Sequence, residues 1–302
     1  MRLPLRVVTV LAALALVALV PGPARAKLRV AASINDLASI AASVGGDRVE
    51  TFAVARPTAD VHRVEVLPSY MVRVARADLY LKVGFELDRW ADGIIDGSRN
   101  GRLRVLDCGV GITPLEKPTT VTAAMGDVHP LGNPHYWLDP RNGAIVARVV
   151  AAELGRLDPA HAADYAARAE AFAAAAAEVH ERGRRAAASL PVRTVFTYHS
   201  SWVYFGQAFG LEIAATAEPV PGIPPTARHL QELVTIATRR PVAALLQEPY
   251  FSDDAGRFLA RACGVPTVRV SPSCDGPQAG SYLAHFDDLF ARLAAARPLP
   301  RP

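Results

Sequence analysis

Short apolar runs alternate along the chain with longer segments in which apolar positions recur every three or four residues. Each run is short enough for a single strand, and the segments between them have helical periodicity. The predicted strands are 28–32, 49–54, 79–83 and 103–106 in the first half, and 193–198, 211–216, 242–247 and 267–270 in the second. Because strands that alternate with helices form βαβ units, the pattern predicts an α/β fold with mainly parallel sheets.

A long helix is predicted between these two halves. Asp158-Pro159 opens a segment, residues 160–189, that is rich in the strong helix formers Ala, Glu and Arg, and Gly183 is tolerated within it. About 29 residues at 1.5 Å each extend over roughly 44 Å, which exceeds the diameter of a small domain. The segment is either a surface helix on a single domain or a strut that joins two lobes.

The alternation on both sides favours the two-lobe organisation. We expect an N-terminal α/β lobe at 27–157, a linking helix at 158–189 and a C-terminal α/β lobe at 190–302. Helix signals support these elements. Ser33 or Asn35 can cap the first helix, Gly45-Gly46 can end it, and Thr226 can cap the helix that runs to about Arg239.

The first 26 residues have the organisation of an export signal. Two arginines precede an apolar run at 7–20, Pro21-Gly-Pro23 interrupts it, and Ala24-Arg-Ala26 is a small-x-small cleavage site. This order predicts a secretory signal peptide, 1–26, that is cleaved after Ala26 to leave a periplasmic chain. The run is shorter than the roughly 20 residues that a membrane-spanning helix needs.

Cleavage would remove most of the positive charge. The whole chain has 33 basic and 29 acidic residues, a net charge of +4, and the predicted signal peptide contains three of the arginines and no acid. The remaining chain is nearly neutral and has no basic run with interleaved aromatic residues. We therefore expect no nucleic-acid partner.

Three cysteines, Cys108, Cys263 and Cys274, belong to the exported part of the chain. Export places them in an oxidising compartment. Cys263 and Cys274 flank one predicted strand and are expected to form a disulfide, which would leave Cys108 as a buried thiol. No CxxC or CxxH spacing occurs, so a thiolate zinc site is not expected.

The eight histidines occupy different kinds of position. Four lie in predicted helices among polar residues and are expected to have no functional role: His161, His180, His229 and His285. In contrast, His62, His135 and His199 lie in loops, and two of these loops adjoin strand ends. Ligands of open α/β sheets collect beyond the carboxyl ends of the strands, and neutral imidazole is a good zinc ligand.

Each of these three histidines stands in a distinctive motif, and a fourth motif follows a later strand. The motifs are Pro57-Thr-Ala-Asp-Val-His62, Pro134-His-Tyr-Trp-Leu-Asp-Pro140, His199-Ser-Ser-Trp-Val-Tyr-Phe205 and Glu248-Pro-Tyr-Phe251. Ser33-Ile-Asn-Asp-Leu37 and Gly45-Gly-Asp47 precede them. In this order and spacing the chain resembles the metal-binding receptor proteins of bacterial ABC transporters for zinc, manganese or iron, over nearly all of its length after residue 26.

This resemblance implies two α/β lobes on a rigid linking helix, with the metal ion in the cleft between them. It implies His62, His135 and His199 as ligands, with a fourth carboxylate ligand in the loop after the last strand. Asp275 matches that place, and Glu248, which also ends a strand, is the alternative. Three histidines and one aspartate suit tetrahedral zinc. Manganese-type members have a carboxylate in place of the third histidine, so His199 favours zinc.

The implied function is an extracytoplasmic receptor that captures zinc and delivers it to an ABC transporter permease. We expect a monomer that is not an enzyme, with a periplasmic metal donor protein as a further candidate partner. Three alternatives are a manganese or iron receptor of the same family, a secreted zinc hydrolase with Glu248 as base, and an organic-solute receptor. The last would use the aromatic residues near the ligands, Tyr136, Trp137, Trp202 and Tyr204.

The surroundings of the first two histidines leave two roles open. Zinc-type members often have a long His- and acid-rich insertion before the second ligand, but here residues 122–133 are few and contain only His129. We expect His129 to be a solvated loop residue, with transient metal capture as the alternative. Asp60 and Glu65 flank His62 and either orient its ring or are ordinary surface acids.

Overall fold

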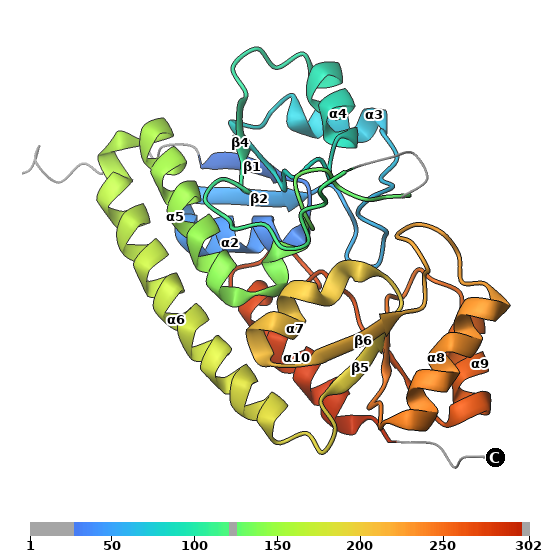
Figure 1. The fold of residues 1–302 in the computed structure, drawn as a ribbon. Helices are drawn as coiled ribbons and strands as arrows, with labels where there is room; N and C mark the ends of the chain where they lie inside the picture. Colours follow the sequence, from blue (N-terminus) through green and yellow to red (C-terminus); the bar gives the residue numbers. More distant parts are fainter. Residues whose placement is uncertain (1–26, 121–125, 298–302) are drawn as a thin grey trace, which may run out of the picture.

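Two parallel sheets form the framework of the protein (Figure 1). The computed structural model describes residues 27–120 and 126–297, so the predicted signal peptide lies outside the described residues. In the described part, β1 (Leu28–Ala32), β2 (Val49–Ala53), β3 (Leu79–Lys82) and β4 (Arg104–Asp107) form one sheet, in the order β2-β1-β3-β4. The other contains β5 (Thr194–Thr197), β6 (Glu212–Thr216), β7 (Leu245–Gln247) and β8 (Thr267–Arg269), in the order β6-β5-β7-β8. The predicted α/β fold with parallel sheets is confirmed.

The strands are apolar because both faces of each sheet are covered. In β1, Val30 and Ala32 pack into the main core. Ala31 packs with Tyr80 into a separate cluster that includes residues of α3 (Pro68–Val74) and α4 (Trp90–Ser98). A parallel strand buried on both faces reads as a continuous apolar run, which explains why the pattern identified it. All neighbours are parallel, so the carboxyl ends of the strands lie at one edge of each sheet.

The helices of the first lobe are α2 (Asn35–Gly45), α3 (Pro68–Val74) and α4 (Trp90–Ser98). Helix α2 ends before Gly46, as predicted, because Gly46 adopts a positive φ of 59°. Its start differs from the prediction. Ile34 is the N-cap and no side chain caps the helix, since the Ser33 hydroxyl instead donates to the Asp88 carboxylate.

Two helices connect the lobes. Helix α5 (Pro140–Leu157) packs along α6 (Ala162–Ala188), and a short 3-10 turn joins them. The 27 residues of α6 span about 40 Å. Figure 1 shows α6, in yellow-green, running beside both lobes. It contacts α2 of the first lobe as well as α7 (Val203–Phe209) and α10 (Ser281–Ala295) of the second, as a strut would.

The second lobe has helices on both faces of its sheet. These are α7 (Val203–Phe209), α8 (Ala227–Arg239), α9 (Asp254–Cys263) and α10 (Ser281–Ala295). Thr226 caps α8, as predicted, by accepting a hydrogen bond from the backbone N–H of His229 at 3.2 Å. Helices α8 and α9 enclose a cluster that belongs to this lobe alone, whereas α7 and α10 face the main core.

One apolar core extends through both lobes. Val30 from the first sheet and Leu246 from the second belong to the same cluster, together with Tyr282 of α10. Hydrogen bonds cross the same boundary. Trp137 donates through Nε1 to the Pro272 carbonyl at 2.7 Å, and the Tyr282 hydroxyl donates to the Trp137 carbonyl at 2.6 Å. The lobes are therefore packed against each other and not merely tethered.

The expected disulfide is absent from the described residues, so this prediction is wrong for the structure. Cys263 ends α9 in the cluster of the second lobe, where its thiol donates to the Leu259 carbonyl at 3.1 Å. Cys274 lies in the main core and its thiol donates to the Gly276 carbonyl. The two side chains are buried in different apolar clusters, so their sulfur atoms are not paired. Cys108 is a fully buried thiol, as expected.

Within residues 27–120 and 126–297, none of the helices combines the length and the apolar character that crossing a membrane requires.

Candidate metal centre

Three of the predicted site residues converge between the lobes. His62 follows β2, His135 precedes the 3-10 turn that leads into α5, and His199 follows β5. One ring nitrogen of each lies within 4.8 Å of the others. The ring centroids are 5.0 Å apart for His62 and His199, 5.1 Å for His62 and His135, and 5.6 Å for His135 and His199. Such spacing allows one small cation to contact all three rings.

Two of the rings are oriented in the same way, by an Asp or Asn side chain two residues earlier in the chain. Asp60, two residues before His62, accepts hydrogen bonds from the His62 backbone N–H at 3.0 Å and from its ring Nδ1 at 2.9 Å. Asn133, two residues before His135, does the same at 3.1 and 2.9 Å. Asx side chains readily bond to backbone two residues ahead. The Asx-x-His pattern in the sequence could therefore have identified Asn133, which the sequence analysis missed. Of the two roles left open for Asp60, these hydrogen bonds support the one in which it orients the His62 ring.

The third ring is held from a neighbouring strand. Glu218, two residues after β6, accepts a 2.6 Å hydrogen bond from Nδ1 of His199 and another, at 3.0 Å, from the Gly222 backbone N–H. Its side chain is buried. Sequence reasoning missed Glu218, although its place just beyond a strand end is the signal that selected His199.

These partners fix the tautomer of every ring. Asn133 Oδ1 and the two carboxylates are acceptors, so each Nδ1 carries a proton and, in the neutral ring, Nε2 keeps its lone pair. The Nε2 atoms of His62 and His135 are buried and have no hydrogen-bond partner in the described structure. A buried nitrogen lone pair without a partner costs free energy, and a metal ion would satisfy it. The donor set therefore fits a cation that prefers nitrogen ligands.

The environment sets the charge of the rings. Burial, reinforced by the nearby His62 and His199, lowers the pKa of His135 far below its usual range, so this ring is neutral. Burial also opposes protonation of His199, but the hydrogen bond to Glu218 and the charge of Glu248 outweigh it and raise its pKa. Although burial alone would raise the pKa of Asp60, its hydrogen bond to His62 lowers it, so its carboxylate stays ionised.

Asp275, the expected fourth ligand, lies outside this cluster. Its side chain is exposed, and the group of convergent donors does not include it. The residues before it explain the orientation. Ser273 donates through its hydroxyl to Asp36 of α2, and Cys274 donates its backbone N–H to the same carboxylate at 3.2 Å. This anchoring holds Ser273 and Cys274 inside the core and leaves Asp275 in solvent.

Glu248, the alternative fourth ligand, lies beside the cluster. Its carboxylate is fully buried, and Oε1 accepts hydrogen bonds from the Ser201 hydroxyl at 2.8 Å and from Trp202 Nε1 at 3.0 Å. Oε2 is buried without a partner in the described structure. Burial raises the pKa of Glu248 to about 7. It is not one of the donors within 4.8 Å of one another, so in this arrangement it acts on His199 through its charge.

His129, expected to be solvated, is only partly exposed. Its ring stacks on that of His62, with centroids 5.4 Å apart, and its Nε2 is buried without a partner in the described structure. Burial, with a smaller effect of His62, lowers the pKa of His129 to about 4. His129, His135 and His199 together line a cavity of about 240 Å³.

The helical histidines make structural hydrogen bonds away from this cavity. His180 is buried, and its Nε2 donates to the Ala208 carbonyl at 3.0 Å. His229 and His285 donate through Nε2 to the carbonyls of Thr216 and Ser271, and His161 bonds to Asp158. Among the described residues, these four histidines lie outside the convergent donor group.

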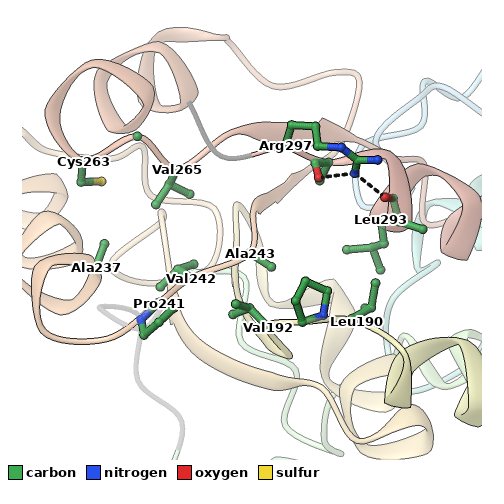
Figure 2. Close-up of a pocket in the computed structure, with 14 residues that line it drawn as sticks. Leu190, Val192, Ala237, Pro241, Val242, Ala243, Cys263, Val265, Leu293 and Arg297 are labelled. Atoms are coloured by element: carbon green, nitrogen blue, oxygen red, sulfur yellow. Dashed lines mark hydrogen bonds between the residues drawn. The ribbon is translucent and has the colours of Figure 1, made fainter. Parts of the chain in front are cut away.

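Aromatic residues pack around the site and do not form an open solute pocket. Tyr136, Trp137, Trp202 and Tyr204 are all buried, and Tyr204 donates its hydroxyl to the Asn133 carbonyl at 3.0 Å. A separate apolar cavity of about 170 Å³ lies in the second lobe (Figure 2). Leu190, Val242 and Leu293 line it, and its described lining contains no histidine or carboxylate. Among its described lining residues, Cys263 has a side chain that can ligate a metal, and its thiol donates to the Leu259 carbonyl.

The chain is similar in sequence and in fold to known metal-uptake proteins. The sequence model of a family described as zinc-uptake complex component A, periplasmic, matches residues 30–296. The iron-binding protein YfeA of Yersinia pestis is 25% identical over 252 residues, which cover 81% of this chain and 76% of that protein. The high-affinity zinc uptake system protein ZnuA of Brucella abortus is 32% identical over 162 residues, 53% of this chain and 46% of that one. A crystal structure of ZnuA superposes with a TM-score of 0.78 at 24% identity, covering 89% of this chain and 99% of that one.

Proposed function

Because the chain belongs to the family of periplasmic zinc-uptake components A, we propose that it captures zinc at His62, His135 and His199 and delivers it to the permease of an ABC transporter. Membership makes the protein a metal-binding solute receptor and not an enzyme. The observation that carries the proposal is the convergence of three buried rings within 4.8 Å, each with its Nδ1 committed to an acceptor.

The donor set supports zinc over iron or manganese. Relatives are named for iron as well as for zinc, so the family alone leaves the metal open. Neutral imidazole nitrogen suits zinc, whereas manganese prefers carboxylate, carbonyl and water oxygens. In the cluster all three donors are imidazoles. The carboxylates of Asp60 and Glu218 accept hydrogen bonds from the Nδ1 atoms of His62 and His199, and Glu248 is not one of the convergent donors.

The polar partners of the rings support a receptor that binds an ion in a defined geometry. Ligand orientation by acceptors at Nδ1 raises the basicity of the ligating nitrogen and reduces the reorganisation that binding requires. Two of the oriented rings come from the first lobe and one from the second, so the proposed ion would bridge the lobes.

Calorimetric titration of the tag-free apoprotein tests the proposal. We expect one zinc ion per chain and weaker binding of manganese and iron(II), the latter measured without oxygen. His135→Ala should abolish tight binding, because it removes a fully buried donor. His161→Ala is the matched control, since His161 bonds to Asp158 away from the site. No zinc binding by the wild type, or tighter binding of manganese, would overturn the proposal.

A further inference from the structure

The segment 126–133 carries a histidine across the opening of the site. Its C-terminal end is fixed in the first lobe, where the Asn133 backbone N–H donates to the Leu115 carbonyl at 2.8 Å. The Tyr204 hydroxyl of α7 donates to the Asn133 carbonyl and accepts from the Leu115 N–H at 2.9 Å. A turn follows His129, because its carbonyl accepts from the Gly132 N–H at 3.1 Å, and Gly132 has the positive φ of 112° that favours glycine.

The other end of this segment is held against the second lobe. The Asp127 backbone N–H donates to the Pro221 carbonyl at 2.9 Å, in the loop that begins with Glu218. The Asp127 carboxylate also pairs with Arg63 at 3.3 Å, next to His62. Two independent contacts thus place the segment over the boundary between the lobes, on the side where the three rings converge.

Between these anchors, His129 points its ring at the cluster. The ring is stacked on His62 with an interplanar angle of 29°, and it lines the same cavity as His135 and His199. Its Nε2 is buried and lacks a hydrogen-bond partner in the described structure, the same condition as Nε2 of His62 and His135. His129 and His135 line this cavity, and His62 stacks on His129. The His129 nitrogen lies outside the group of donors within 4.8 Å of one another, so it must move toward them to share an ion.

We infer that His129 is the fourth ligand, so that the site is an all-imidazole, four-coordinate zinc centre closed by segment 126–133. The inference rests on the proposed function and deepens it. Four donors complete the tetrahedral shell that zinc adopts in closed sites. Because no oxygen ligand is needed, such a site discriminates against manganese more strongly than a site with a carboxylate. It also accounts for the solvent-exposed position of Asp275.

X-ray absorption spectroscopy of the zinc-loaded full chain tests this without any variant. The expected result is four nitrogen neighbours at about 2.0 Å with the outer-sphere pattern of four imidazoles. His129→Gln should give three imidazoles plus an oxygen neighbour and should weaken zinc binding at least about tenfold. His161→Gln should leave both measurements unchanged.

The outcomes separate the two proposals. If the wild type binds zinc one to one but shows three imidazoles, and His129→Gln binds equally tightly, the fourth-ligand assignment is overturned and the receptor function stands. If the wild type binds no zinc, the receptor function itself fails. Asp275→Ala and Glu248→Gln complete the comparison, because a larger loss of affinity in either one than in His129→Gln would transfer the fourth position to that carboxylate.

Discussion

At the residue scale, one acceptor oxygen orients the ring of each site histidine. Asp60, Asn133 and Glu218 each accept from the Nδ1 of one ring, and none of them belongs to the convergent donor group. Their contribution is to hold the tautomer and the ring plane before the ion arrives. The properties of the site therefore depend on residues just outside it.

Glu218 offers the clearest test at this scale. Glu218→Ala removes the acceptor of His199, so the ring loses its orientation, and we expect zinc affinity to fall about 10- to 100-fold. Glu218→Gln retains an acceptor oxygen and should keep most of the affinity. Competition with a chromophoric zinc chelator measures both variants. Equal affinity in Glu218→Ala and the wild type would show that the hydrogen bond is irrelevant to binding.

Glu248 should make the stability of the apoprotein depend on pH. Its pKa is 4.5 in the unfolded chain and about 7 in the folded one, because burial disfavours the charged form. Between these values the folded state binds more protons, so the free energy of unfolding falls as pH rises, by about 3 kcal/mol from pH 4.5 to 7. Thermal unfolding should show Glu248→Gln gaining stability relative to wild type at pH 8 and not at pH 4.5. A difference that is the same at both pH values would contradict this.

At the scale of elements, the long helix has a specific packing requirement. Gly183 lies in α6 where the rings of Phe209 and Phe290 pack against it. A Cβ at this position would come within 2.4 Å of Phe209 and 2.7 Å of Phe290. A glycine that the sequence analysis treated only as tolerated in a helix is thus the place where α6 meets α7 and α10.

Replacing Gly183 with alanine should destabilise the protein, although alanine is usually favoured over glycine inside a helix. Ala is about 1 kcal/mol better than Gly in a helix interior, but at Gly183 we expect Gly183→Ala to destabilise the protein by about 1–3 kcal/mol through overpacking. Gly93 of α4 is the matched control, because it is exposed and a Cβ there meets only Val66 at 3.5 Å. Gly93→Ala should be neutral or stabilising. Chemical denaturation measures both, and a stabilised Gly183→Ala would contradict the packing argument.

At the scale of the whole molecule, the two lobes repeat one topology and share one core. The sheet orders β2-β1-β3-β4 and β6-β5-β7-β8 are equivalent, although the sequence shows no repeat beyond the alternation of strands and helices. The core that includes Val30, Leu246 and Tyr282 joins the lobes, and the strut α6 packs on both. A large apolar interface of this kind opposes free movement of the lobes.

A shared core has two measurable consequences. The apoprotein should unfold in a single cooperative transition, with near- and far-ultraviolet circular dichroism changing together. Zinc should leave the radius of gyration from small-angle scattering unchanged within its error, since binding is expected to order the site without closing the lobes. Two separate transitions, or a clear compaction on zinc binding, would show that the lobes move independently.

The predicted export signal is tested separately, on the native protein. Sequencing the N-terminus of the protein isolated from its own compartment should find Lys27 as the first residue. Intact residues 1–26 on the mature protein would contradict the prediction.

The sequence by itself predicted the elements of the fold, and with the family resemblance it predicted three metal-ligating histidines. Strands and helices follow local periodicity, and each of the three histidines stands in a short local motif, so local pattern was sufficient to predict them. Only the tertiary structure decided what depends on distant contacts. Asp36 holds the loop before Asp275 so that this carboxylate faces solvent, and the core that separates Cys263 from Cys274 leaves no disulfide in the described residues. Pro221 and Arg63 bring His129 to the site, and Glu218 reaches His199 from another strand. These residues are far apart in the chain, and their contacts exist only once the sheets and the strut have placed them.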